Sequence, residues 1–388
     1  MRLIFIADAA DMDPTLKILR DLVATDSVNP SLVQNAVGEQ DVAELIAAEL
    51  RTIGLDVEMT DIVPGRPNVV GVLEGRAPGR VLMFCGHMDT VGVDGMREPF
   101  KPVEREGRLY GRGTQDMKGG IAAILGAART LVDSGGLKTG RLVIAAVCDE
   151  EHASLGAEAL VNHWTADGAV VTEPTDLRIA VAHQGLVWTD VLTRGRAAHG
   201  SRPKDGQDAI MHMGRVLARF EELNAALQGK LAHPLVGTAS LHASTISGGR
   251  ELSVYPDRAV LRLERRTVPG ETEAMVLREV ETILMSLKAD DAKFEGECRV
   301  MFSRPPHELS ADHALTRTLG EALSDRGFSA DTTGMTFWTD AGIFGCSGIP
   351  SLLFGPGGAG LHSTEEYVNL QDVLDCRDVL VDLARDFC

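Results

Sequence analysis

Four short apolar runs in the first half of the chain constrain its fold more than any other feature. They are apolar at consecutive positions, which is typical of strands buried on both faces in a parallel sheet. The runs span residues 68–73, 81–85, 142–148 and 169–172. Between them, apolar residues over 121–132 recur every three or four positions and predict an amphipathic helix. The sequence therefore predicts an α/β fold with a mixed, largely parallel sheet and helices on both faces.

From about residue 183 the pattern changes to the order β-α-β-β-α-β. The predicted strands span 187–194, 239–247, 252–265 and 294–302, and the predicted helices span 208–227 and 273–287. This order is the split-βαβ, ferredoxin-like signature. Afterwards the first pattern resumes, with a helix over 309–326, a strand over 350–354 and a helix over 370–387.

A chain of 388 residues exceeds the usual single-domain length of about 100–200 residues. We therefore expect one domain made of residues 1–182 and 304–388, interrupted by an inserted α+β ferredoxin-like domain of residues 183–303.

The charge balance argues against several classes of partner. The chain has 38 Lys and Arg against 56 Asp and Glu, a net charge of −18. Nucleic acids and anionic membranes both select basic surfaces, so neither is expected as a partner. No apolar run approaches the roughly 18 residues of a membrane helix. The apolar start of the chain is too short for a signal peptide, so we expect a cytoplasmic protein.

The six cysteines are widely scattered and form no CxxC pair, which argues against a disulfide framework. Cys85 and Cys148 end apolar runs, and we expect them to be small buried residues.

Five loops place reactive side chains directly after a strand or before a helix, where open α/β sheets bind their ligands. The candidates are His87 and Asp89; Asp116; Asp149, Glu150 and Glu151; Glu173; and His362 with Glu366. Each loop alone also fits a simpler reading, such as a turn, a helix N-cap at Asp116 or a solvated acidic turn at 149–151. The glycines of 355–360 match the GxGxxG spacing but open no helix, which argues against a dinucleotide site.

Together these loops supply two histidines and several carboxylates along the edge of one sheet. Three adjacent carboxylates at 149–151 repel one another, and in a cleft a bound cation would relieve that repulsion. One of the three could stay uncoordinated and act as a base. The set suffices for a two-metal hydrolytic site. Mixed histidine and carboxylate ligands favour Zn²⁺, with Mn²⁺ and Co²⁺ as alternatives.

The motifs in these loops resemble those of the M20 family of metallopeptidases and deacylases. The matching stretches are GHMDTV (86–91), YGRGTQDMKGG (110–120), CDEE (148–151), TEPT (172–175), GRAAHGSRPKDG (195–206), ISGG (246–249), YPDRA (255–259), ERRTVPGET (264–272) and GPGGAGLHSTEEYV (355–368). They cover nearly the whole chain in the family's order, and GRGxxDMKGG is the most specific of them. The resemblance implies a di-metal peptidase-like catalytic domain, with the inserted domain acting as a lid.

The resemblance also implies how two divalent ions are held. The ligands of one ion would be His87, Asp116 and Glu173, and those of the other would be His362, Asp116 and Glu151. Asp116 would then bridge the two ions, and the peptide bond between Asp116 and Met117 would be cis. Glu150 would be the general base, and Asp89 would orient His87.

Further residues are implied for the substrate. His199 of the lid would reach the substrate across the interface of a homodimer joined through the lid domains. Arg266 lies where the family binds the substrate carboxylate, a role that suits the bidentate geometry of arginine. The family usually has asparagine thirteen residues before that arginine, but this chain has Ser253, so the contact to a second substrate oxygen differs. Asp340 is a further candidate pocket residue.

From these residues we predict a di-metal hydrolase that cleaves the amide bond of a small N-acyl amino acid, deacetylase- or desuccinylase-like. Metal-activated water would attack and Glu150 would accept its proton. The partner would be a small molecule with a free carboxylate. A metallo-dipeptidase or carboxypeptidase acting on small peptides is the alternative, because the same site would serve it.

Overall fold

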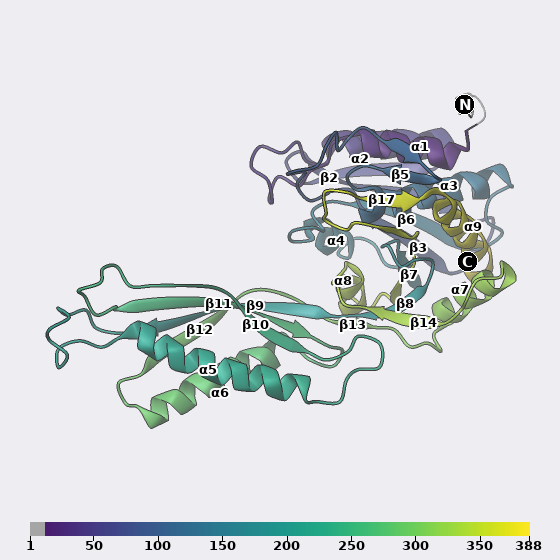
Figure 1. Ribbon diagram of the computed structural model, residues 1–388. Helices are drawn as coiled ribbons and strands as arrows, with labels where there is room; N and C mark the ends of the chain where they lie inside the picture. Colours follow the sequence, from purple (N-terminus) through teal and green to yellow (C-terminus); the bar gives the residue numbers. More distant parts are fainter. Residues whose placement is uncertain (1–11) are drawn as a thin grey trace. The chain divides into compact units, whose positions relative to one another are not determined.

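The computed structural model describes residues 12–388 of the chain. They form two compact units (Figure 1). Unit 1 contains the chain up to Val181 together with Leu309–Thr333 and Thr339–Cys388, and unit 2 contains Ala182–Glu308 and Gly334–Trp338. No helix within residues 12–388 has the length and hydrophobicity needed to cross a membrane.

A mixed sheet forms the centre of unit 1, with its strands in the order β1, β2, β6, β3, β7, β15 and β8. The bounds are β1 Asp56–Val63, β2 Arg66–Glu74, β3 Val81–His87, β6 Arg141–Val147, β7 Gly168–Val171, β8 Ile179–His183 and β15 Ser351–Leu353. The neighbours β6, β3, β7 and β15 run parallel. The pairs β1–β2, β2–β6 and β15–β8 are antiparallel. The mixed α/β class is confirmed, and parallel pairing is confined to the centre of the sheet.

Strand β2, which contains the apolar run at 68–73, shows why pairing departs from parallel at this edge. Only Pro64 and Gly65 separate β1 from β2, and Gly65 has a positive φ of 75°. Strands joined by so short a turn must pair antiparallel, whereas parallel strands need a crossover of a dozen residues or more. Residues 88–140, which include a helix, provide that crossover between β3 and β6. Connection length therefore sets the strand direction where the apolar pattern does not.

Helices cover both faces of this sheet, as predicted (Figure 1). On one face α2 lies over Gly71, α3 over Gly86, and α7 and α9 over Gly168. On the other face Ser351 donates a hydrogen bond to the carbonyl of Ala341 in α8, and α4 lies beside α8. Helix α1 packs on α3 and α9. The bounds are α1 Pro14–Ala24, α2 Gln40–Ile53, α3 Gly119–Asp133, α4 Leu155–Leu160, α7 Ala314–Asp325, α8 Ala341–Cys346 and α9 Leu370–Phe387.

A second, small antiparallel sheet in unit 1 has the order β16, β17, β5, β4. Its strands are β4 Val103–Arg105, β5 Arg108–Tyr110, β16 Gly358–Ala359 and β17 Tyr367–Asn369. Tyr110 pairs with Tyr367 across β5 and β17, and their ring centroids lie 5.2 Å apart. The sheet therefore holds the segment after Tyr110 against the segment before Tyr367.

Unit 2 has an antiparallel sheet in the order β10, β11, β9, β12 with two long helices. Its elements are β9 Gly185–Arg194, α5 Ala209–Gln228, β10 Ser240–Gly248, β11 Arg258–Thr267, α6 Glu273–Asp290 and β12 Glu295–Arg304. Counted along the chain the strand order is 2-3-1-4, which is the ferredoxin-like arrangement predicted from the sequence. Val191 and Leu261 of the sheet share a buried core with Val216 of α5 and Val280 of α6. The remaining strands, β13 His307–Glu308 and β14 Thr332–Met335, do not join this sheet, because both pair with β8.

Two predicted elements begin later than expected. The strand predicted from residue 252 begins at Arg258, because Leu252 is fully exposed and Pro256 has no N–H to donate to a sheet. The helix predicted from residue 309 begins at Ala314. Leu309 instead donates its N–H to the carbonyl of Val181 at 2.7 Å, and the helix is capped at its start by the side chain of His313.

Candidate metal centre

The polar side chains that follow the central strands of unit 1 converge at one edge of the sheet. His87 is the last residue of β3, Glu173 follows β7 by two residues, and Glu150 and Glu151 follow β6. Because these strands are parallel neighbours, their carboxyl ends lie side by side. Asp116 is added by the wide turn Thr114–Lys118 that precedes α3.

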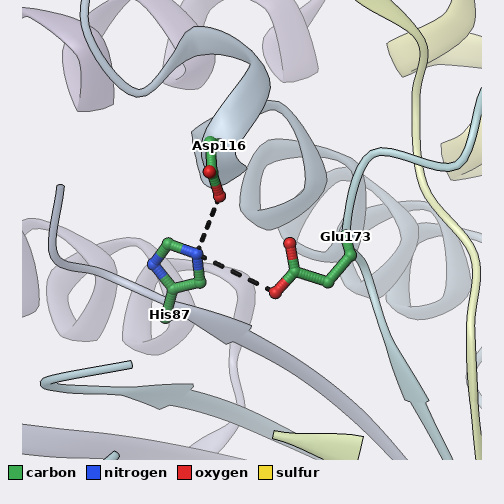
Figure 2. Close-up of side chains that lie close together, drawn as sticks. All are labelled: His87, Asp116 and Glu173. Carbon is green, nitrogen blue, oxygen red and sulfur yellow. Dashed lines mark hydrogen bonds and ion pairs between the residues drawn. The ribbon is translucent and has the colours of Figure 1, made fainter. Parts of the chain in front are cut away.

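Three of these residues form a first group, which we name site A (Figure 2). His87 Nε2 lies 3.0 Å from Asp116 Oδ1 and 3.9 Å from Glu173 Oε1. One ligand atom from each of the three residues lies within 4.8 Å of the others. Glu150 Oε2 is also 3.9 Å from His87 Nε2.

A second group, site B, consists of Asp116, Glu151 and His362. His362 Nε2 lies 3.2 Å from Asp116 Oδ2 and 3.1 Å from Glu151 Oε2. Asp116 thus presents one carboxylate oxygen to each group. The Asp116–Met117 peptide bond is cis, as the family resemblance implies.

The donor set fits divalent cations. Two imidazole nitrogens and the carboxylates of Asp116, Glu151 and Glu173 are the ligand types that suit Zn²⁺ and its neighbours. Glu151 Oε1 is buried and has no hydrogen-bond partner among the described residues. A buried acceptor without a donor is costly, and a cation would satisfy it.

Burial and like charges shift the pKa values of the carboxylates. Burial is the largest cause for Glu150 and Glu173, whose pKa values are raised well above the usual range, and the charge of Asp340 adds to it. Burial and the charge of Asp116 raise the pKa of Glu151 to about 7. Asp340 is itself buried at the start of α8, and it adds a further carboxylate to those of Asp89, Asp116, Glu150, Glu151 and Glu173.

The histidines compensate part of this charge. Burial opposes the charged form of His87, but hydrogen bonds with Asp116 and Asp89 outweigh it and raise its pKa well above the usual value. Hydrogen bonds with Asp116 and Glu151 raise the pKa of His362 to about 10. Burial favours the neutral form of Asp116, but its hydrogen bonds with both histidines lower its pKa. Without a metal, the protons on His87 and His362 supply positive charge. A divalent ion in each group would supply that charge instead.

Asp89 contacts both the histidine of site A and the loop that carries the two glutamates. His87 Nδ1 lies 3.0 Å from the Asp89 carbonyl oxygen and 3.6 Å from Oδ1, which turns Nε2 toward site A. The Asp89 carboxylate also accepts the backbone N–H groups of Glu150 and Glu151, each at 3.1 Å. Asn29 donates to the same carboxylate at 2.8 Å. Asp89 therefore connects the strand of His87 to the loop of the two glutamates.

Beneath that loop lies a buried ion network that the sequence did not reveal. Asp149 has a positive φ of 67° and accepts hydrogen bonds from Asn29 at 3.0 Å and from Arg66 at 2.8 Å. Arg66 also donates to Glu39 through Nε and Nη2, at 2.8 Å and 2.5 Å. Asn29, Glu39 and Arg66 lie in segments distant from the 149–151 loop along the chain. Neither apolar periodicity nor motif spacing indicates contacts of that kind.

The substrate residues inferred for the lid lie in unit 2. His199 is exposed, and its Nδ1 lies 2.8 Å from the hydroxyl of Ser201. The next residue, Gly200, donates its N–H to the carbonyl of Ser253 at 2.7 Å, so these two loops lie together. Arg266 is partly exposed on β11 and donates to Glu264 at 2.7 Å.

Comparison with known proteins gives a consistent result. The model of Peptidase family M20/M25/M40 matches residues 83–386. The acetylornithine deacetylase of Myxococcus xanthus is 32% identical over 355 residues, 88% of this chain and 90% of that protein. That of Proteus mirabilis (strain HI4320) is 28% identical over 387 residues, 96% of either chain.

Solved structures share the fold. Aminopeptidase PepT from Bacillus cereus superimposes with a TM-score of 0.79 at 19% identity, covering 96% of this chain and 98% of that one. The Bacillus subtilis YXEP protein, described as a dinuclear metal binding peptidase from the M20 family, has a TM-score of 0.74 at 16% identity. The match covers 98% of this chain and 100% of that chain.

Proposed function

This chain belongs to peptidase family M20/M25/M40 and is a metallohydrolase of that family, and on this premise we propose that it removes the acyl group from a small N-acyl amino acid. The observation that carries the proposal is the shared carboxylate: Asp116 presents one oxygen to His87 and the other to His362. The choice of a deacylase over a peptidase is supported by the names of the relatives at 28–32% identity.

In this proposal His87, Asp116 and Glu173 would hold one divalent ion, and Asp116, Glu151 and His362 would hold the other. Such ions activate water as a nucleophile and polarise the scissile carbonyl. Zn²⁺ is our first choice because it accepts both histidine and carboxylate ligands, with Co²⁺ and Mn²⁺ as alternatives.

Glu150 is the proposed general base. It lies 3.9 Å from His87 Nε2, beside site A, yet neither ligand group requires it. Its buried carboxylate has a raised pKa, which suits a group that accepts a proton from water and then delivers it to the leaving amine. Asp89 holds the backbone of Glu150 through a 3.1 Å hydrogen bond and so positions the base.

For the substrate we propose that Arg266 binds the free carboxylate, that His199 stabilises the developing oxyanion, and that Ser253 lies where a second substrate oxygen is bound. Asp340 is proposed as a pocket residue close to Glu173 and Glu150, which its charge influences. Closure of the inserted lid would bring the lid residues to the substrate and exclude water. The cytoplasmic location stays a prediction from the sequence.

The test is a panel of N-acyl amino acids and dipeptides, assayed with Zn²⁺, Co²⁺ and Mn²⁺ in turn. We expect the N-acyl amino acids to be hydrolysed with the higher kcat/KM, and the Glu150→Gln variant to lose both activities. Faster hydrolysis of dipeptides would contradict the deacylase proposal and favour the metallo-dipeptidase alternative. Loss of activity on removal of the substrate carboxylate would support the role given to Arg266.

We further propose a homodimer joined through unit 2, in which His199 acts in the active site of its partner. Mixing His199→Ala with Glu150→Gln tests this, since each variant alone is inactive. With shared sites, half of the randomly mixed dimers carry one intact site, so activity should return to about a quarter of wild type. No recovery after demonstrated subunit exchange would contradict the shared site.

A further inference from the structure

Glu366 is a buried carboxylate, and both of its oxygens accept hydrogen bonds from the segment that carries Asp116. It is 1% exposed. Its Oε2 accepts from Arg112 Nη1 at 2.6 Å and from the N–H of Gly113 at 3.0 Å. Its Oε1 accepts from the N–H groups of Gln115 at 2.9 Å and Asp116 at 3.2 Å. The backbone N–H groups of Gly113, Gln115 and Asp116 therefore all donate to the side chain of Glu366.

Further hydrogen bonds join the same two segments. Arg112 donates a second hydrogen bond, from Nη2 to the carbonyl oxygen of Ser363 at 3.0 Å, one residue after His362. The N–H of Gly111 donates to the backbone carbonyl of Glu366 at 3.2 Å. The segments 111–116 and 362–366, each of which carries one side chain of site B, are thus tied together by side chains and backbone. We name this set of contacts the Arg112–Glu366 clamp.

His362 needs such support more than the other ligands do. Its side chain is 54% exposed, so packing does not fix it, and its φ of 57° is a conformation that residues other than glycine rarely adopt. His87 and Glu173, by contrast, project from the ends of buried strands of the central sheet. Site B therefore depends on the clamp for two of its three residues, and site A depends on it for Asp116 alone.

We propose that Glu366, paired with Arg112, is a positioning residue that holds Asp116 and His362 in the positions needed to bind the ion of site B. This inference rests on the proposed function, because it presupposes a metal in each group. Residues that orient metal ligands typically change metal affinity by about 10- to 100-fold when they are replaced. The expected effect is selective: the ion of site B should be weakened far more than the ion of site A.

The variant that tests this is Glu366→Gln. Glutamine keeps the size of the side chain, but its NH₂ group would face the N–H and guanidinium donors that the carboxylate accepts. The matched control is Glu271→Gln in unit 2. Glu271 also accepts from a buried arginine, Arg265, at 2.7 Å and from a backbone N–H at 3.1 Å, yet it lies in a different unit from both ligand groups.

Titration of metal-free protein with Co²⁺ alone, followed by calorimetry and visible absorption, gives a readout that needs no substrate. Wild type and Glu271→Gln should bind two ions per chain. Glu366→Gln should bind one ion as wild type does and the second about 10- to 100-fold more weakly. Its one-ion spectrum should match that of Glu151→Gln, which lacks a ligand of site B. Folding of each variant is checked by thermal melting.

Two unchanged affinities in folded Glu366→Gln would overturn the inference, as would an equal weakening of both ions. If Glu366→Gln does not fold, Arg112→Lys replaces it, since lysine cannot donate to Glu366 and to the Ser363 carbonyl with the same planar geometry. A selective loss of the second ion in that variant supports the clamp, and retention of both overturns it. Failure of wild type to bind Co²⁺ would refute the metal centre itself, and so the proposed function.

Discussion

Replacing Arg66 with methionine removes the only cation that contacts both Glu39 and Asp149 among the described residues. The Arg66 side chain is 8% exposed and those of the two carboxylates are 0% exposed. It donates to Glu39 at 2.8 Å and 2.5 Å, and through Nη1 to Asp149 at 2.8 Å and to the hydroxyl of Ser31 at 3.0 Å. Methionine preserves the apolar stem of the side chain but none of these donors.

The size of the effect follows from burial. Exposed ion pairs contribute about 0–1 kcal/mol, but removing one partner of a buried pair costs about 3–5 kcal/mol because the remaining charge stays buried. Asp149 keeps a hydrogen bond from Asn29 at 3.0 Å, and Glu39 keeps one from the N–H of Asp149 at 3.2 Å. These remaining donors point to the lower part of the range, a loss of about 3 kcal/mol in the free energy of unfolding.

Urea unfolding measured by circular dichroism gives the change in midpoint and slope. Because the chain has two units and need not unfold in one step, hydrogen exchange of β2 and β6 should locate the loss in unit 1. Arg129→Met is the control. The Arg129–Glu49 pair is also in unit 1, but its side chains are 28% and 22% exposed, so we expect a loss of at most about 1 kcal/mol.

The pH dependence provides an independent check. Burial already raises the pKa of Glu39, and loss of Arg66 should raise it further. The folded variant then binds more protons than the unfolded chain, so its deficit in stability should shrink as the pH falls. The double variant Arg66→Met/Glu39→Gln should recover part of the loss. A deficit below about 1 kcal/mol that does not change with pH would refute the reasoning.

Three further predictions concern catalysis, pH and metal. Glu150→Gln should retain Co²⁺ affinity while kcat falls by about two to four decades, and near-native turnover in a stopped assay would contradict its role as base. Burial and the nearby His307 lower the pKa of His183 to about 3, so the unfolded chain gains a proton near pH 6.5 that the folded chain does not. Wild type should thus lose about 2 kcal/mol of stability between about pH 7 and 5 through this group, and urea titrations of His183→Gln should lack that component. Removal of divalent ions with a chelator should lower the melting temperature, since ligand at 100 times its Kd stabilises by about 2.7 kcal/mol, and an unchanged melt would contradict the two-ion site.

The architecture could be predicted from the sequence where local patterns decide it. Buried apolar runs predicted the central strands, and amphipathic spacing predicted α3, α5, α6 and α9. Helix α1 was missed although its signals were present: Asp13 caps it, Pro14 begins it, and Ile18, Leu19 and Leu22 have helical spacing. The direction of β2 depended on the length of a connection, and the start of β11 depended on Pro256. The start of α7 depended on the hydrogen bond from Leu309 to Val181 and on the cap at His313. Apolar periodicity reports none of these.

In the candidate site, too, the sequence predicts the residues that local patterns mark and misses those that only the tertiary fold brings together. The ligand residues could be named because each follows a strand or precedes a helix, and the family motifs assigned their roles. The side chains that support them could not. Arg66 and Glu39 are 27 positions apart, and Arg112 and Glu366 are 254 positions apart. The sequence shows Glu366 only as a loop carboxylate, because the donors that it meets are brought to it by the tertiary fold.

Strand β15 has a consequence for how the protein is made. It lies between β7 and β8 in the finished sheet, yet it follows β7 by some 180 residues, and unit 2 is encoded in between. At about 5–20 residues per second a ribosome needs roughly 10 to 40 s to cover that distance. During this time β7 presents an unpaired hydrophobic edge, the kind of surface on which nascent chains aggregate. Unit 2, whose sheet is continuous in sequence, can fold during the wait, while His362 and Glu366 reach the site last. The metal centre is therefore completed only after the whole of unit 2 has been synthesised.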